Sequence, residues 1–236
     1  MQLTEQGYAG ADNLEVMTQA VRYNAYLFDL LDELLRDDSG PVLDFGAGLG
    51  TFAGLLQHRG CSVTCVEPDE AMRSRLERMG LRSHASVAEL PGASYGLIYS
   101  FNVLEHIRDD LDTLVQLRHQ LTADGRLLLF VPAFQLLYSS MDRKVGHFRR
   151  YRMDGLTGLL RDAGYEVDSA RYVDSLGFFA SLVYRLVGRG DGSIDDRALI
   201  AYDRWVFPLS VLIDRLTWRW FGKNLAVVAR PAAGLS

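Results

Sequence analysis

Three glycines on alternate positions, Gly46, Gly48 and Gly50, follow the apolar run "PVLDF", which contains one acid, Asp44. Because glycine has no Cβ atom, such a turn can adopt dihedral angles that a side chain disfavours and can let the backbone approach a bulky ligand closely. A second acid, Glu67, stands near the end of the next apolar run, "SVTCVEP". A glycine turn and a carboxylate after neighbouring strands predict a cofactor site.

The spacing of the glycines separates the cofactor classes that use such a turn. The dinucleotide fingerprint G-x-G-x-x-G requires a third glycine where this chain has Thr51. A P-loop requires Gly-Lys-Ser or Gly-Lys-Thr, and neither follows the turn. A nicotinamide-dependent oxidoreductase is therefore the alternative rather than the leading interpretation.

The elements around the turn alternate between short apolar runs and helical patterns. We expect strands at 41–45, 62–68, 81–86, 95–103 and 126–133, and helices at 51–59, 69–80 and about 107–121. Helices of this length between strands imply a parallel sheet with right-handed crossovers and helices on both faces. In such a doubly wound α/β fold, ligands bind beyond the carboxyl ends of the strands, where Asp44 and Glu67 stand.

The remaining segments add to this core. The length predicts a single domain over 1–236, with an N-terminal helical cap at 1–38 whose amphipathic helix spans 13–36. Residues 134–154 have no sustained period and are expected to form a long ordered loop. A further helix and two further strands are expected at 156–164, 165–173 and 224–231. The mostly apolar and aromatic segment 174–223 predicts a helical insertion that covers the site.

The segments "VLDFGAGLG" and "YGLIYSFNVLEHIRD" resemble those of the class I S-adenosylmethionine-dependent methyltransferases, and the likeness extends over about residues 40–133. The second segment is particularly similar to the branch that contains quinone-biosynthesis C-methyltransferases. The resemblance implies a Rossmann-like seven-stranded sheet and S-adenosyl-L-methionine as the cofactor. It also implies S-adenosyl-L-homocysteine as the product and a small-molecule methyl acceptor.

The resemblance further implies roles for individual residues in holding the cofactor. Glu67 would accept hydrogen bonds from both ribose hydroxyls and Asp44 would lie near the ammonium group, although Asp44 could instead cap the turn and Glu67 could begin a solvated helix. Many relatives carry an acid for the adenine amino group where this chain has Ser86, so adenine recognition is expected from the backbone near Val87. The expected cofactor-binding residues are Tyr23, Asp44, Gly46, Ala47, Gly48, Glu67, Pro68, Val87, Asn102 and Val103.

Methyl transfer is an in-line displacement, so an enzyme must chiefly align the acceptor and exclude water, and it needs a base only where the acceptor atom loses a proton. The expected catalytic residues are His106, His147 and Tyr151. His106 could equally pack against the cofactor. The run "DRKVGHFRRYR" at 142–152 predicts an anionic acceptor, or else a solvated basic face. The expected acceptor-binding residues are Tyr138, Arg149 and Arg150. No metal ligands are expected.

The composition limits the partners. The formal net charge is −5 and the pI about 5.5, so no global positive field favours nucleic acids. The polar N-terminus lacks a secretory signal and the two cysteines are expected to stay reduced, which predicts a cytoplasmic location. Apolar stretches of the insertion could contact a lipid-like substrate, a membrane surface or a second copy in a homodimer. An inactive cofactor-binding partner subunit is the alternative to an enzyme.

Overall fold

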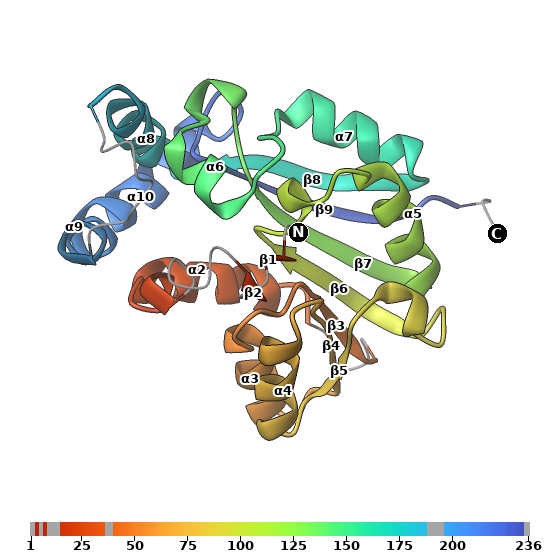
Figure 1. Cartoon of the computed structure of the whole chain (residues 1–236). Coiled ribbons are helices and arrows are strands. Elements are labelled where there is room, and N and C mark those ends of the chain that lie inside the picture. Colours follow the sequence, from red (N-terminus) through yellow and green to blue (C-terminus); the bar gives the residue numbers. More distant parts are fainter. Residues whose placement is uncertain (1–2, 5–6, 9–14, 36–39, 188–195, 234–236) are drawn as a thin grey trace.

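A seven-stranded mixed sheet forms the centre of the computed structural model, which describes residues 3–4, 7–8, 15–35, 40–187 and 196–233 (Figure 1). The strands are β3 (Val42–Phe45), β4 (Val63–Val66), β5 (Arg82–His84), β6 (Tyr95–Phe101), β7 (Leu121–Pro132), β8 (Tyr165–Val173) and β9 (Asn224–Pro231). Their order is β5-β4-β3-β6-β7-β9-β8; β9 runs antiparallel to both β7 and β8, and the other neighbouring pairs are parallel. The chain leaves β3 toward β4 on one side and returns to β6 on the other, so the crevice of the fold opens at the end of β3.

Both faces of this sheet are buried, because successive strand side chains point to opposite sides. Leu43 and Ile98 pack in the core beneath two helices, whereas the preceding residues Val42 and Leu97 pack in the core on the other face. The helices of the first core are α5 (Asp110–Gln120) and α7 (Met153–Asp162), and those of the second are α2 (Val21–Asp32), α3 (Thr51–His58) and α4 (Glu70–Arg78). The expected strands and the helices between them are therefore present.

A separate antiparallel pair, β1 (Leu3–Thr4) with β2 (Gly7–Tyr8), precedes the sheet in the chain. The expected N-terminal helix over 13–36 is interrupted in the structure: residues 15–17 are helical, a turn follows at 18–19, and α2 then spans Val21–Asp32. Residues 13, 14 and 36 lie outside the described residues. Ala20 precedes the helix and offers no capping side chain, so the first amide groups of α2 need partners from elsewhere in the chain.

The expectation of a loop throughout 134–154 was wrong, because this segment contains a 3-10 turn, η3 (Gln135–Leu137), and a short helix, α6 (Ser140–Val145). Ser139 and Asp142 form a capping box at the start of α6, and Gly146 ends it with a φ of +80°. Six residues are too few to produce an apolar period, so only the caps could have revealed this helix.

The segment between β8 and β9 is helical, as expected. It contains α8 (Ser175–Val187), α9 (Asp196–Ala201), a π-helical turn (Tyr202–Val206) and α10 (Phe207–Thr217). Figure 1 shows α8, α9 and α10 grouped beyond the end of α2, away from α5 and α7. No helix among the described residues combines the length and the apolarity needed to cross a membrane.

This insertion holds the N-terminal helix in place. The Asp203 carboxylate accepts hydrogen bonds from the backbone N–H groups of Arg22 (2.9 Å) and Tyr23 (2.8 Å), which are the orphan donors of α2. The Phe207 ring packs edge-on against Tyr23 and Tyr26, with ring centroids 5.4 Å and 5.7 Å apart. A residue about 180 positions away in the sequence therefore acts as the cap of α2.

Candidate active site

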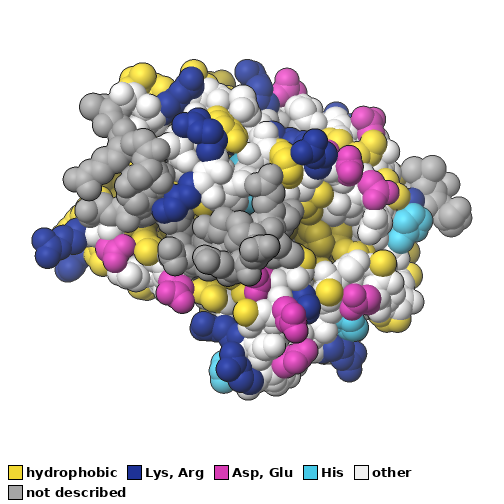
Figure 2. All heavy atoms as spheres, viewed as in Figure 1, with side chains coloured by type: hydrophobic (Ala, Val, Ile, Leu, Met, Phe, Trp, Pro, Cys, Tyr) yellow, Lys and Arg dark blue, Asp and Glu magenta, His cyan; other side chains and the backbone are white. Residues whose placement is uncertain are grey.

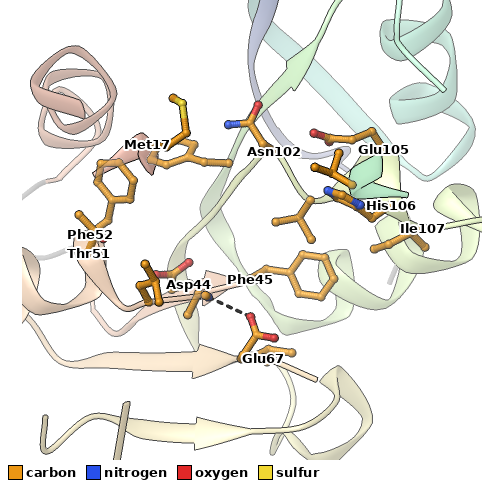
Figure 3. Close-up of a pocket in the computed structure, with 18 of the residues that line it drawn as sticks. Met17, Asp44, Phe45, Thr51, Phe52, Glu67, Asn102, Glu105, His106 and Ile107 are labelled. Atoms are coloured by element: carbon orange, nitrogen blue, oxygen red, sulfur yellow. Dashed lines mark hydrogen bonds between the residues drawn. The ribbon is translucent and has the colours of Figure 1, made fainter. Parts of the chain in front are cut away.

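A cavity of about 480 Å³ opens beyond the carboxyl ends of β3, β4 and β6. In Figure 3, Glu67 lies on one side of it, and Asn102, Glu105 and His106 lie on the opposite side. The cavity brings together thirteen of the residues predicted from the sequence, namely Tyr23, Asp44, Gly46, Ala47, Gly48, Glu67, Pro68, Val87, Asn102, Val103, His106, His147 and Arg150. Lys223 is the one described residue of 174–223 that lines the cavity. The described part of the insertion therefore does not cover the cavity as expected. It contacts α2, and α2 places Tyr23 in the cavity wall.

The glycine turn forms one wall. Gly46, Gly48 and Gly50 all have positive φ values, of 84°, 50° and 77°. A Cβ atom on Gly46 would lie 2.3 Å from Val103 Cγ2, and one on Gly50 would lie 2.6 Å from a methyl carbon of Leu76. Both the dihedral angles and the close packing therefore require glycine at these positions.

The Glu67 carboxylate ties the turn to β4. Its Oε2 accepts a hydrogen bond from the Gly48 N–H and its Oε1 accepts one from the Asp69 N–H, each at 2.9 Å. Asp69 in turn caps α4 by accepting from the Met72 N–H. Burial raises the pKa of Glu67, and the two backbone N–H groups offset part of this rise. Each carboxylate oxygen has accepting capacity left on the cavity side, which suits a vicinal pair of hydroxyls.

Asp44 is buried under the turn, where the Tyr99 hydroxyl donates a 2.6 Å hydrogen bond to its Oδ2. Burial raises the pKa of Asp44 to about 7, although the Tyr99 hydrogen bond acts in the opposite direction. A cation placed in the cavity beside Asp44 would favour its ionised form.

The opposite wall begins with Asn102, which directly follows β6 and has an unusual positive φ of 56°. Its backbone N–H donates to the Phe130 carbonyl, and its side chain contacts the Tyr23 hydroxyl. Burial raises the pKa of Tyr23, so this hydroxyl stays neutral near pH 7. The strained backbone of Asn102 and the helix α2 thus meet at the edge of the cavity.

His106 and His147 lie edge to face at the far end of the cavity, with ring centroids 4.5 Å apart. Burial and the neighbouring His147 lower the pKa of His106 to about 3, so its ring is neutral near pH 7. The His147 Nδ1 lies 2.7 Å from Oδ1 of Asp142, a fully buried carboxylate that also accepts two hydrogen bonds from the Arg150 guanidinium. Burial alone would raise the pKa of Asp142, but the hydrogen bonds from His147 and Arg150 outweigh it and hold the pKa below its usual range.

Glu105 also lines this end of the cavity and was not predicted from the sequence. Its side chain is fully buried, and burial raises its pKa to about 8, with its own backbone N–H and Arg150 offsetting part of the rise. The segment "NVLEH" directly precedes the helix expected at about 107–121, but its pattern does not predict which of its side chains face the cavity. For Asp142 the sequence likewise indicates only a place in a charged segment, 142–152.

Three predicted residues do not line the cavity among the residues that the structure describes: Tyr138, Arg149 and Tyr151. The guanidinium of Arg149 pairs with Asp110 at 2.5 Å, and the Tyr151 hydroxyl donates to the same carboxylate at 2.9 Å. The Tyr138 hydroxyl donates to the backbone carbonyl of His147 at 2.8 Å. These side chains hold the loop between β7 and α7 in shape, and their direct roles in catalysis and acceptor binding stay predictions.

The Methyltransferase domain family matches residues 19–170 of this chain. A Mycolicibacterium smegmatis protein described as a "Probable S-adenosylmethionine-dependent methyltransferase" is 32% identical over 162 residues, which cover 65% of this chain and 61% of that protein. A Mycobacterium tuberculosis protein with the same description is 32% identical over 138 residues, 55% of this chain and 50% of that protein. The solved geranyl diphosphate C-methyltransferase from Streptomyces coelicolor superposes with a TM-score of 0.63 at 14% identity, covering 92% of this chain and 82% of that one.

The chain belongs to the methyltransferase-domain family, and its fold and glycine turn are those of the class I S-adenosylmethionine-dependent enzymes. The predicted family and the seven-stranded Rossmann-like fold are confirmed, and the descriptions of the relatives support the predicted enzyme class and cofactor. The matched region spans between one half and two thirds of the length of the two curated relatives, so the acceptor and the partners of the whole protein are matters of proposal.

Proposed function

We propose that this chain methylates a small amphiphilic molecule that binds in the cavity between the glycine turn and His147, with S-adenosyl-L-methionine as the methyl donor. The observation that carries the proposal is a single continuous cavity, with a glycine cradle and the Glu67 carboxylate at one end and two histidines at the other. Its volume of about 480 Å³ lies within the roughly 300–1,000 Å³ that is typical of small-molecule sites.

The residues present fit the cofactor. A Cβ atom would fill the cradle at Gly46, and Glu67 keeps accepting capacity for the ribose hydroxyls after its two backbone contacts. Asp44 would face the ammonium group, and Asn102 and Val103 would bound the place where the reacting atoms meet. When bound, S-adenosylmethionine supplies a methyl group on a positively charged sulfur. The chain itself has to align the acceptor in line with that group and exclude water.

A weak proton acceptor is available where the methylated atom carries a proton. The His106 ring is neutral near pH 7 and lies in the cavity wall, where it can orient a hydroxyl or an amine, but its low pKa makes it a weak base. His147 lies beside it and is oriented by Asp142. The Tyr151 hydroxyl donates to Asp110, which favours a role for Tyr151 in shaping the loop over the predicted direct role in catalysis.

The lining of the cavity supports an amphiphilic acceptor better than an anionic one. The cavity has apolar walls, including Phe45, Phe52 and Ile107. Arg150 lines the cavity, but its guanidinium already donates two hydrogen bonds to the Asp142 carboxylate, which balances its positive charge. Lys223 is the other cation in the described lining, and burial lowers its pKa. A hydrophobic body with a small polar head therefore suits the cavity better than a multiply charged anion.

The helical insertion supports contact with an anionic membrane surface, from which such an acceptor could enter. Large apolar side chains are strongly exposed on it, among them Leu186 (76%), Trp205 (70%), Leu216 (77%) and Trp220 (69%). The exposed charged residues of the described insertion are five arginines, Arg185, Arg197, Arg204, Arg215 and Arg219, and one acid, Asp196. Figure 2 shows Lys and Arg side chains along the α8 to α10 side of the molecule. Arginine and tryptophan together are typical of interfacial segments.

Transfer of a radioactive methyl group tests the proposed activity. The purified chain is incubated with labelled S-adenosylmethionine and fractionated extract, and the label is expected in an organic-extractable molecule of low mass. Label in protein or nucleic acid would contradict the acceptor class, and no transfer by a chain that binds the cofactor would favour the inactive partner subunit. Calorimetric titration with NAD tests the alternative that the chain is an oxidoreductase. That alternative predicts that NAD binds more tightly than S-adenosylmethionine does.

A further inference from the structure

The least expected group in the cavity wall is the Glu105 carboxylate. It has no exposed surface, and neither of its oxygens has a hydrogen-bond partner among the residues that the structure describes. A buried carboxylate without partners is costly, because nothing replaces the water that it has lost. Such a group in a cavity wall points to a ligand that supplies the missing partner.

Two histidines stand close enough to share that ligand. One ligand atom each from Glu105, His106 and His147 lie within 4.8 Å of one another. The His147 Nε2 lies 3.7 Å from Glu105 Oε1. Ligand atoms around a tetrahedral cation with bonds of about 2.0–2.1 Å lie roughly 3.3 Å apart, so only small side-chain movements would close the set.

The surroundings orient His147 as a ligand. Asp142 engages the His147 Nδ1 at 2.7 Å, which places the hydrogen on Nδ1 and leaves the Nε2 lone pair facing Glu105. Asp142 is itself fixed by Arg150 and by the backbone N–H of Ser139. A carboxylate that orients the second nitrogen of a histidine is a common arrangement behind metal-binding imidazoles.

We propose that Glu105, His106 and His147 bind a divalent first-row transition-metal cation at the acceptor end of the cavity. Two imidazoles and one carboxylate suit cations such as Zn²⁺ or Co²⁺ better than Mg²⁺ or Ca²⁺, which prefer oxygen ligands. Three protein ligands leave a coordination position open toward the cavity, where an oxygen of the acceptor can bind. This last role depends on the proposed methyl transfer, whereas binding of the cation does not.

Titration of the metal-free protein with Zn²⁺ tests the site without any cofactor. We expect one Zn²⁺ per chain by calorimetry, and a visible absorption band when Co²⁺ is used in its place. Glu105→Gln keeps the size of the side chain and removes the carboxylate ligand, and it should weaken Zn²⁺ binding at least about 100-fold, since loss of an orienting residue alone typically costs about 10- to 100-fold.

The matched control is the surface pair of His84 and Glu89, whose side chains lie 3.6 Å apart. The double variant His84→Ala/Glu89→Gln should bind Zn²⁺ as the wild type does. The proposal would be overturned if the double variant lost as much Zn²⁺ affinity as Glu105→Gln does, or if Glu105→Gln bound Zn²⁺ as tightly as the wild type. Absence of Zn²⁺ and Co²⁺ binding by the folded wild type would also overturn it.

Thermal unfolding separates ligand loss from misfolding. Because the oxygens of the buried Glu105 carboxylate have no hydrogen-bond partner among the described residues, Glu105→Gln should leave the Tm of the metal-free protein unchanged or raise it. It should also abolish the rise in Tm that Zn²⁺ gives the wild type. A lower Tm in the metal-free variant would instead indicate a structural role for Glu105. If Zn²⁺ binds but no acceptor is methylated, the proposed function fails and the metal site stands.

Discussion

The Glu67 carboxylate accepts a hydrogen bond from the Gly48 N–H at 2.9 Å, and this contact joins the end of β4 to the glycine turn that follows β3. The contact fixes the distance between the two parts of the sequence that first indicated a cofactor site. It also directs the remaining acceptor capacity of Glu67 into the cavity. Substitutions at Glu67 should therefore affect cofactor binding more than folding.

Glu67→Gln should weaken binding of S-adenosylmethionine by about 10- to 100-fold, because hydrogen bonds to a charged acceptor contribute about 1.5–3 kcal/mol. Isothermal titration calorimetry measures the change in Kd. The control is Glu77→Gln, on the exposed face of α4. Equal affinities of Glu67→Gln and the wild type would remove Glu67 from the cofactor site.

Gly46→Ala should destabilise the protein and abolish cofactor binding. The new methyl group meets Val103 Cγ2 at 2.3 Å in a residue whose φ is +84°. Gly60→Ala is a matched control, because Gly60 has the same φ and no atom lies within 4 Å of the place that its new methyl group would take. Both variants incur the cost of about 1–2 kcal/mol for a left-handed residue, and Gly46→Ala should lose about 1–3 kcal/mol more.

Chemical denaturation of the two glycine variants gives the difference in their free energies of unfolding. A second substitution, Val103→Ala, should restore part of the stability of Gly46→Ala and none of that of Gly60→Ala. Equal stability of the two single variants would show that Val103 yields freely and that packing does not require glycine at position 46.

Asp44 should make the stability of the cofactor-free protein depend on pH. Burial raises its pKa to about 7, above its ordinary value of 3.8, so the native state holds a proton that the unfolded state loses. The stabilisation is complete below about pH 4 and declines as the pH rises through 7. Asp44→Asn should therefore raise the Tm relative to the wild type, and it should raise it more at pH 8.5 than at pH 5.5, where only part of the stabilisation has been lost.

Differential scanning fluorimetry at the two pH values measures this contrast. Tyr99→Phe serves as the companion variant, because it removes the 2.6 Å hydrogen bond to the ionised Asp44 and should lower the Tm chiefly at pH 8.5. The same change of Tm at both pH values in Asp44→Asn would exclude titration of Asp44 as the cause.

Asp203→Ala should loosen the N-terminal helix. Loss of a capping side chain costs about 0.5–2 kcal/mol, and here two backbone donors of α2 lose their partner. Hydrogen exchange should become faster at Arg22 and Tyr23, and cofactor affinity should fall because Tyr23 lines the cavity. Asp196→Ala, in the exposed first turn of α9, should change neither. Unchanged exchange in Asp203→Ala would mean that the insertion does not hold α2.

The exposed face of the insertion should bind anionic vesicles. Sedimentation with vesicles of phosphatidylglycerol should retain the wild type, and vesicles of phosphatidylcholine should retain less of it. Trp205→Ala/Trp220→Ala should reduce retention, whereas the control Leu55→Ala, which removes an exposed apolar side chain from α3, should not. A concentration-dependent dimer that the tryptophan substitutions dissociate, with no vesicle binding, would assign this face to a second copy of the chain.

The central part of the fold could be read from the sequence because its signals are local. The strands around Leu43 and Ile98 are short apolar runs between helical patterns, and the glycines after β3 have few conformational substitutes. Glu67 was predictable for the same reason, since it follows its strand directly. The short helix at 140–145 was missed because its caps, rather than any apolar period, define it.

The sequence by itself therefore determined the order of the elements, the glycine turn and the cofactor end of the site, all of which depend on residues close together in the chain. Only the tertiary structure decided which charges face the cavity. Folding pairs Arg149 with Asp110 and Arg150 with Asp142, and it brings Glu105 beside His147. Burial of a charge requires a partner, and most of these partners lie tens of residues away, where no local pattern in the sequence can identify them.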